Sequence, residues 1–441
     1  MRLSVPCALL AATLVVAPRP ASPQDAPVAF VGARLVPIEG PEISNGVLVV
    51  HRGRIVAIGD AATTRVPADA ARRDVAGKVI LPGLVDTHSH IGSVEGADAS
   101  APLQPDVRVL DSVDVRSPQI QKAQAGGITT VNVMPGSGHL LSGQTLYLKL
   151  RDGGTIDDLT MRDPDGRLRG GIKMANGTNS RRAPPFPGTR AKSAALVREQ
   201  LVKAQEYRDK VKTAAGDVKK LPPRDLGMEA LAEVLEGKRV VHFHTHRHDD
   251  ILTAIRLSKE FGFRVVLQHV SEAWKVADQI AASKAPASII MIDSPGGKLE
   301  TQDVHFRNGA ALEKAGALVG FHTDDGITDS RLFLRSAALA VRAGMSREMA
   351  LRGMTLSGAE MLDMADRVGS LKVGKDADFM VLTGDPLSVY THVLETWVDG
   401  ARVFDRENAK DRLFAVGGYG AGSPDSDLEG MIAAEGAEDW Q

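Results

Sequence analysis

Hydrophobic and polar positions follow two different patterns along this chain of 441 residues. In the segments 27–81 and 366–412, apolar and polar residues alternate and turn signals separate the runs, which is typical of antiparallel strands. Residues 82–365 instead alternate short apolar runs with amphipathic helices, over a length that suits a (β/α)8 barrel. The sequence therefore predicts an α/β fold: a (β/α)8 TIM barrel with a small β-sandwich domain formed by the N- and C-terminal segments.

The two ends of the chain have compositions of their own. Residues 1–26 begin with Arg2 and an apolar run to Ala17, which predicts a signal peptide and a secreted or periplasmic protein. This run is too short for a membrane span, so no stable membrane insertion is expected. Residues 413–441 are rich in Gly, Ser, Asp and Glu, which predicts a flexible tail.

Charge and cysteine content narrow the kinds of partner and of chemistry. The net charge is −2 with acidic and basic residues interspersed, so nothing favours nucleic acid, and a small molecule or a peptide is the expected substrate. The sequence leaves open whether the chain forms a homo-oligomer. The single cysteine, Cys7, lies in the predicted signal peptide, so any transition-metal site in the mature chain must use nitrogen and oxygen ligands.

A pair of histidines ends the first apolar run of the predicted barrel, in "LPGLVDTHSH". Because side chains two residues apart on a strand point the same way, His88 and His90 present two imidazoles to one place. Two imidazoles on one face suit a metal ion. The alternative is two histidines that only pack at a strand end, so the metal hypothesis needs further ligands elsewhere.

Further candidate ligands follow later apolar runs. In a barrel, groups at the C-terminal ends of strands should recur at multiples of one βα unit, roughly 31 residues. Asp324 follows His88 by 236 residues, which is seven to eight units. His269 follows His244 by 25 residues and precedes Asp324 by 55, which are about one and two units. This spacing supports the metal hypothesis.

Five stretches of this sequence resemble the amidohydrolase superfamily: "PGLVDTHSH", "HFHTHR", "LQHVSEA", "FHTDDG" and "VGSLKVGKDADFMVL". The similarity covers about residues 30–412 and is to the secreted branch that includes imidazolonepropionase-like and Xaa-dipeptidase-like proteins. The resemblance implies a barrel that binds one or two divalent ions, most commonly Zn²⁺, and a catalytic role for Asp324. It implies that the metal ligands are His88, His90, His244, His269 and Asp324.

The predicted fourth strand, in "RGGIKMANG", carries Lys173 between the apolar residues Ile172 and Met174. Burying an unpaired ammonium group is costly, so this lysine is either exposed, salt-bridged or chemically modified. In the members of the amidohydrolase superfamily that bind two metal ions, a lysine at this strand is carbamylated and bridges the two ions. The resemblance therefore implies a carbamate on Lys173 as a sixth metal ligand.

Other residues are candidates for contacts with the substrate. His246 shares a face with His244 and could exchange with it as the ligand from the fifth strand. His139 lies in a loop, where histidines are more often just solvated than in contact with a substrate. Arg182 and Arg247 could bind a carboxylate, although exposed arginines explain both equally well. An insert at 181–223 contains a helical pattern and is a candidate lid.

These ligands predict a hydrolase that cleaves a C–N amide bond in a dipeptide-like, N-acyl or cyclic amide substrate. Bound zinc lowers the pKa of water toward about 7 and so provides hydroxide at neutral pH. Asp324 would take the proton of the water and return it to the leaving nitrogen. Two alternatives remain: a lactonase or phosphotriesterase that uses the same site, and a non-catalytic metal-binding barrel.

Overall fold

The computed structural model describes residues 26–94, 96–291 and 298–417. The predicted signal peptide therefore lies outside the described residues, apart from its last position. No helix in the described ranges is long and apolar enough to cross a membrane. Helix α11 (Ala409–Val416) includes the first residues of the predicted flexible tail, and 418–441 lies outside the described part.

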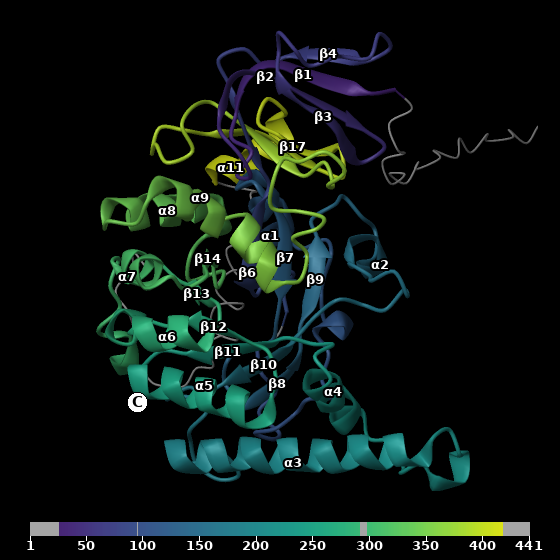
Figure 1. Cartoon of the computed structure of the whole chain (residues 1–441), viewed down its shortest axis with the longest axis vertical. Helices are drawn as coiled ribbons and strands as arrows, with labels where there is room; N and C mark the ends of the chain where they lie inside the picture. The colour runs from purple at the N-terminus through teal and green to yellow at the C-terminus, as the bar shows by residue number, and fades with distance from the viewer. Residues whose placement is uncertain (1–25, 95, 292–297, 418–441) are drawn as a thin grey trace, which may run out of the picture.

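The two terminal segments of the chain meet in one eight-stranded sheet, at the top of Figure 1. Strand β15 pairs antiparallel with β5, which joins the C-terminal segment to the N-terminal one. Phe30, Phe379 and Trp397 pack their rings together at centroid distances of 5.0 to 5.6 Å, which anchors one face of the sheet. The arrangement of this domain as a sandwich stays a prediction. The strands are β1 (Val28–Leu35), β2 (Ile43–His51), β3 (Arg54–Asp60), β4 (Ala71–Asp74), β5 (Val79–Pro82), β15 (Phe379–Leu382), β16 (Val393–Val398) and β17 (Ala401–Asp405).

Two further sheets form the centre of the molecule. One has the strand order β14-β13-β12-β11-β10-β8 and is parallel from β10 to β14, and the other has the order β6-β7-β9 with β6 parallel to β7. The strands are β6 (Leu84–Ser89), β7 (Ile128–Val133), β8 (Leu141–Gln144), β9 (Leu146–Lys149), β10 (Ile172–Ala175), β11 (Val241–Thr245), β12 (Val265–His269), β13 (Ala287–Ile289) and β14 (Val319–Phe321).

The third strand position departs from the predicted (β/α)8 repeat. Strand β9 pairs antiparallel with β7, and β8, which precedes β9 by a single residue, pairs antiparallel with β10. The segment 141–149 thus bridges the two central sheets and runs against its neighbours. The physical reason is the short connection 134–140, because a parallel return needs a crossover of about a dozen residues or more.

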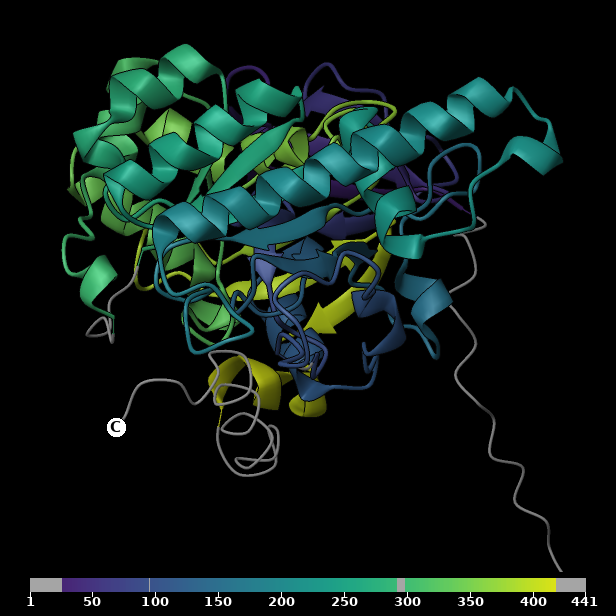
Figure 2. The same ribbon diagram turned by 90° about the horizontal axis from the view of Figure 1, so that it is seen from below.

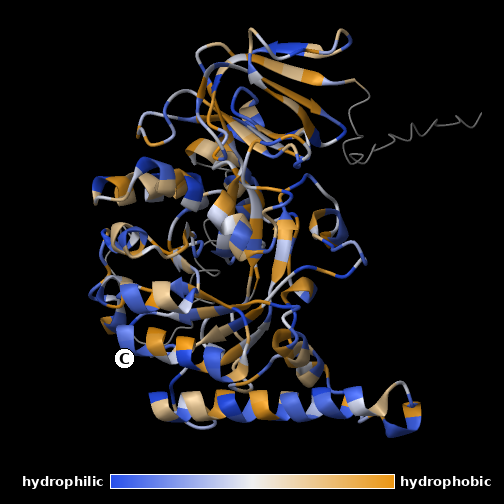
Figure 3. Cartoon of the chain, viewed as in Figure 1, coloured by the Kyte–Doolittle hydropathy of each residue, from blue (hydrophilic) through white to orange (hydrophobic). Residues whose placement is uncertain are grey.

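Helices surround the central sheets in both views (Figures 1 and 2). The longest, α3, forms most of the predicted insert and packs on α4 and α5. Its Val197, Leu201 and Ala204 are buried, while Val211 is 38% exposed. Polar and apolar residues alternate along α3, as Figure 3 shows. The helices are α1 (Pro118–Ala125), α2 (Ile156–Leu159), α3 (Arg190–Ala214), α4 (Leu226–Leu235), α5 (His248–Phe261), α6 (Ala277–Ser283), α7 (Asn308–Ala315), α8 (Phe333–Arg342), α9 (Arg347–Gly353) and α10 (Leu356–Met361), with short 3-10 helices at η1 (Val109–Asp111), η2 (Val218–Lys220), η3 (Ala273–Lys275), η4 (Leu299–Thr301) and η5 (Ser330–Leu332).

Candidate metal centre and active site

The six predicted metal ligands come from five strands of the two central sheets. His88 lies on β6 and His90 follows that strand, while Lys173 lies on β10, His244 on β11 and His269 at the end of β12. Asp324 follows β14 by three residues, and its amide donates a hydrogen bond of 2.9 Å to the carbonyl of His88. The fold thus brings the ends of β6 and β14 together, although they are far apart in the sequence.

The first group of ligands lies within hydrogen-bonding distance of one carboxylate. Asp324 Oδ1 lies 3.2 Å from His88 Nε2 and 3.0 Å from His90 Nε2, and the two imidazole nitrogens are 3.3 Å apart. Lys173 Nζ lies 2.9 Å from His88 Nε2 and 3.1 Å from the sulfur of Met134. Three ligand atoms at such mutual distances can surround one divalent ion.

The second group of imidazoles is centred on His269. The ring of His244 lies 4.3 Å from the ring of His269, and the ring of His246 stacks on it at 5.0 Å. His269 Nδ1 lies 3.8 Å from Asp324 Oδ2, so this carboxylate connects the two groups. His244 and His246 also form a potential metal-binding group with Glu300, whose ligand atoms lie within 4.8 Å of theirs.

Burial sets the protonation of these groups. Burial lowers the pKa of His88, His244 and His269 well below the usual value, so all three imidazoles are neutral. Burial alone would raise the pKa of Asp324, but its close contacts with the imidazoles, which include hydrogen bonds with His88 and His90, hold this pKa well below its usual value. Burial lowers the pKa of Lys173 to about 7. Neutral imidazoles and an ionised carboxylate are the protonation states that a divalent metal ion binds.

Several buried ring nitrogens of the site have no hydrogen-bond partner among the described residues. They include Nδ1 of His88, both ring nitrogens of His244, Nε2 of His246 and Nε2 of His269. Buried polar atoms nearly always have a partner, and a metal ion would supply one here. These residues therefore fit a divalent ion. Of the two candidates at the end of β11, His244 has both ring nitrogens free, whereas His246, which follows the strand, has its Nδ1 2.8 Å from Ser271 Oγ.

Two ligands adopt a backbone conformation that is unusual for residues with side chains. The φ angle is +68° at His269 and +51° at Asp324. The left-handed region is disfavoured for such residues, and strain of this kind is concentrated at functional sites. These backbone conformations direct both side chains from the strand ends toward the shared centre.

The sequence analysis gave no role to Asp86, which accepts hydrogen bonds from the backbone next to two of the predicted ligands. Asp86 is fully buried and accepts hydrogen bonds from the backbone amides of Thr323 at 3.0 Å and His88 at 3.3 Å. It thereby ties β6 to the residue before Asp324. Burial raises its pKa to about 7. The signal was present in the sequence, because Asp86, His88 and His90 lie two residues apart on one face of the strand.

His322 lies beside His269 in this cluster. Its Nε2 lies 3.0 Å from His269 Nδ1, and its Nδ1 lies 2.8 Å from Ser288 Oγ, which in turn lies 2.6 Å from Thr87 Oγ1. This chain of contacts fixes the orientation of the His269 ring. Such supporting hydrogen bonds normally orient the ligands of a metal site.

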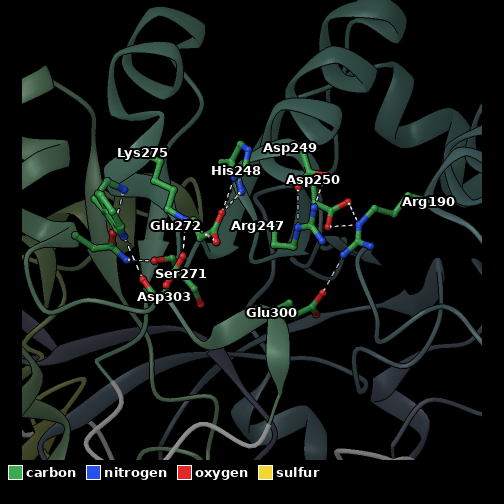
Figure 4. Close-up of polar contacts among 12 residues, drawn as sticks. Arg190, Arg247, His248, Asp249, Asp250, Ser271, Glu272, Lys275, Glu300 and Asp303 are labelled. Carbon is green, nitrogen blue, oxygen red and sulfur yellow. Dashed lines mark hydrogen bonds and ion pairs between the residues drawn. The ribbon is translucent and has the colours of Figure 1, made fainter.

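The structure separates the four candidate substrate contacts. His139 and Arg182 lie together, with Arg182 NH2 3.3 Å from His139 Nδ1 and its guanidinium 4.2 Å from the ring of Phe186. His246 is buried beside His244. Arg247 instead forms two hydrogen bonds of 3.0 Å with Asp249 at the start of α5 (Figure 4).

Imidazole and carboxylate groups at the ends of parallel strands, in a TIM-barrel-like α/β fold, define a class of metal-binding hydrolases. The model of the amidohydrolase family Amidohydro_3 matches residues 210–404. The crystal structure of an amidohydrolase from Thermotoga maritima MSB8 superimposes with a TM-score of 0.80 at 33% identity, over 86% of this chain and 100% of that one. The chain belongs to the amidohydrolase superfamily.

Two curated proteins are more distant relatives. Amidohydrolase tasK from Hapsidospora irregularis is 29% identical over 392 residues, and the match covers 82% of this chain but 40% of that protein. An imidazolonepropionase from Sphingopyxis alaskensis is 24% identical over 404 residues, covering 81% of this chain and 92% of that protein. The chain thus spans less than half the length of tasK.

Proposed function

We propose that this protein is a metal-dependent hydrolase that cleaves an amide C–N bond in a dipeptide-like, N-acyl or cyclic amide substrate. The observation that carries this proposal is the group of His88, His90 and Asp324, whose ligand atoms lie within 3.3 Å of one another, beside further imidazoles with free nitrogens. Membership of the amidohydrolase superfamily supports the same chemistry.

Each residue of the site has a defined task in this proposal. One or two zinc ions, held by His88, His90, His244, His269 and Asp324, would supply an activated water at neutral pH and polarise the substrate carbonyl. Asp324 accepts the proton of the attacking water and returns it to the nitrogen of the broken C–N bond. The hydrogen bond that Asp86 accepts from the His88 amide, and the contact of His322 with His269, keep these ligands in place.

The carbamate on Lys173 is part of this proposal. Lys173 is fully buried, and its described contacts are an imidazole nitrogen and a thioether rather than a carboxylate. Loss of one proton from the ammonium group, addition of the neutral amine to the carbon of CO2 and loss of a second proton would replace a buried cation by an anionic oxygen ligand. This change removes the cost of the unpaired ammonium group and supplies a bridge between two ions.

We further propose a closed barrel. Two observations support closure: the Asp324 amide donates a hydrogen bond to the carbonyl of His88, which links the end of β14 to β6, and the segment 141–149 pairs with both β7 and β10. Export from the cytoplasm and a sandwich arrangement of the terminal domain complete the proposal. They rest on the sequence patterns of residues 1–26 and of the terminal strands.

The test is a hydrolysis panel with metal-loaded protein. Dipeptides, N-acyl amino acids and cyclic amides are compared with lactones and phosphotriesters, and Asp324→Asn is the matched inactive variant. Amide cleavage that Asp324→Asn loses is the expected result. Preferential cleavage of lactones or phosphotriesters would redirect the assignment to those substrates, and no turnover of any compound would leave a metal-binding barrel.

A further inference from the structure

Glu300 is a buried carboxylate beside the metal centre that the sequence did not indicate. Its side chain is 2% exposed, and it lies on the short helix η4 after β13. Its ligand oxygen lies within 4.8 Å of the ligand atoms of His244 and His246. Oε1 of Glu300 has no hydrogen-bond partner in the described part of the chain. Burying a carboxylate oxygen without a hydrogen-bond partner costs free energy, which indicates that a bound molecule or ion supplies the missing partner of Oε1.

Contacts with three other residues of the fold fix the position of the Glu300 side chain. Glu300 Oε2 accepts a hydrogen bond of 2.9 Å from the amide of Thr178 and lies 3.5 Å from Arg190 at the start of α3. Gly177, with φ at +78°, leaves room for it, because an added Cβ would lie 2.6 Å from Oε2. Figure 4 shows Glu300 below Arg190, whose guanidinium also binds Asp250.

The negative charge of Glu300 is only weakly neutralised by these contacts. Arg190 lies 2.8 and 3.0 Å from the two oxygens of Asp250, so its charge is mainly engaged there, and its contact with Glu300 is the longer one. Lys298 lies near enough to lower the pKa of His244 and His246, but no ion pair joins it to Glu300 among the described residues. The free oxygen therefore favours a cationic partner.

We propose that Glu300 binds the free α-amino group of the substrate, so that the enzyme prefers peptides with an unblocked N-terminal residue. The inference rests on the proposed amide hydrolysis and deepens it. An α-amino nitrogen lies about 2.5 Å from the carbonyl carbon of its own residue. A scissile carbonyl beside His244 therefore places that ammonium group within reach of Glu300. His246 Nε2, also without a partner, lies in the same group.

A metal ion on Glu300 is the competing explanation. His244 belongs to the proposed metal centre. An ion held by Glu300 would therefore compete with the ion of that centre for the imidazole of His244. Without His244, only His246 and Glu300 would remain as protein ligands, fewer than the three or four that zinc sites use. An ammonium group needs only the carboxylate and one further acceptor.

The experiment compares a dipeptide with its N-acetylated form as substrates of the metal-loaded protein. The wild type should hydrolyse the free dipeptide with a kcat/KM about 10- to 100-fold higher, as expected for one hydrogen-bonded ion pair. In Glu300→Gln this ratio should fall to about 1, and Glu300→Asp should retain part of it. Glu272→Gln is the matched control, because the Glu272 carboxylate is paired with His248 and Lys275 (Figure 4). In this variant the ratio of the two kcat/KM values should equal that of the wild type.

Equal rates on both peptides in the wild type, or a ratio that Glu300→Gln leaves unchanged, would overturn the inference. A loss of one bound metal ion in Glu300→Gln would overturn it in favour of the metal explanation. If the wild type hydrolyses no amide at all, the proposed function fails. Calorimetric binding of the same two peptides then decides this inference alone: tighter binding of the free peptide that Glu300→Gln abolishes supports it, and equal affinities refute it.

Discussion

Replacing Lys149 by methionine should destabilise the fold strongly, because this lysine is a fully buried cation that three carboxylates surround. Its Nζ lies 3.0 Å from Asp378 and also contacts Asp376 and Asp399. Burial alone would lower the pKa of Lys149, but these three carboxylates raise it, so the side chain stays an ammonium. Lys149 lies on β9, so the cluster ties the central sheets to the terminal one.

The expected loss of folding free energy depends on which cationic partners the three carboxylates keep in the variant. Asp376 keeps its ion pair with Arg367 at 2.8 Å, and Asp399 keeps Arg151 at 2.6 Å. Asp378 has no other cation among the described residues, so Lys149→Met leaves it buried and unpaired. Removing one partner of a buried pair costs about 3–5 kcal/mol. That is a large part of the 5–15 kcal/mol that typically stabilises a folded domain.

Urea unfolding at pH 7, followed by circular dichroism, measures this loss. The matched control is Lys203→Met, which removes an exposed lysine paired with Glu199 on the surface of α3 and should leave the unfolding midpoint unchanged. If Lys149→Met costs less than about 1 kcal/mol, the magnitude of an exposed pair, the cluster does not stabilise the fold as its burial indicates.

Three further predictions concern single residues. Asp324→Asn should lower kcat by at least 100- to 10,000-fold in a fold that melts as the wild type does, because the residue is both ligand and proton acceptor; a variant with more than a tenth of the activity would contradict this. Lys173→Ala should lose the second metal ion and most activity, and short carboxylic acids should partly restore both, whereas rescue by amines would indicate an ordinary ammonium group. Burial alone would raise the pKa of Glu39, but hydrogen bonds from Ser370 and Lys375 lower it to about 2. The stability lost in Glu39→Gln should therefore be constant above about pH 4.5 and shrink as the pH falls toward 2; a difference that is the same at pH 2 and pH 7 would refute this.

Much of the candidate metal centre, as a group of side chains that meet, could be predicted because strand alternation is local. His88 and His90 share a face for the same reason that any residues two apart on a strand do, and apolar runs before His244 and His269 marked the other strand ends. Asp86 follows the same rule and could have been found. The direction of the segment 141–149 could not, because a short apolar run has the same pattern in a parallel and an antiparallel strand.

Glu300 and Lys149 lay outside the reach of sequence patterns for a different reason. Glu300 follows no periodic run, and its contacts with Thr178 and Arg190 join segments 122 and 110 residues apart. Lys149 lies in an ordinary strand, "LYLK", and its carboxylate partners lie 227 to 250 residues later. Only the tertiary fold brings such groups together, so their chemistry appears when the structure is known.

Metal titration tests the central claim most directly. The purified protein is stripped with a chelator, and zinc is added back in measured equivalents while hydrolysis of a dipeptide is followed. We predict that stripping abolishes hydrolysis and that activity rises linearly with added zinc to a plateau at one or two ions per chain. Hydrolysis that survives complete removal of metal, or zinc that binds without restoring any activity, would contradict the assignment of His88, His90, His244, His269 and Asp324 as a catalytic metal centre.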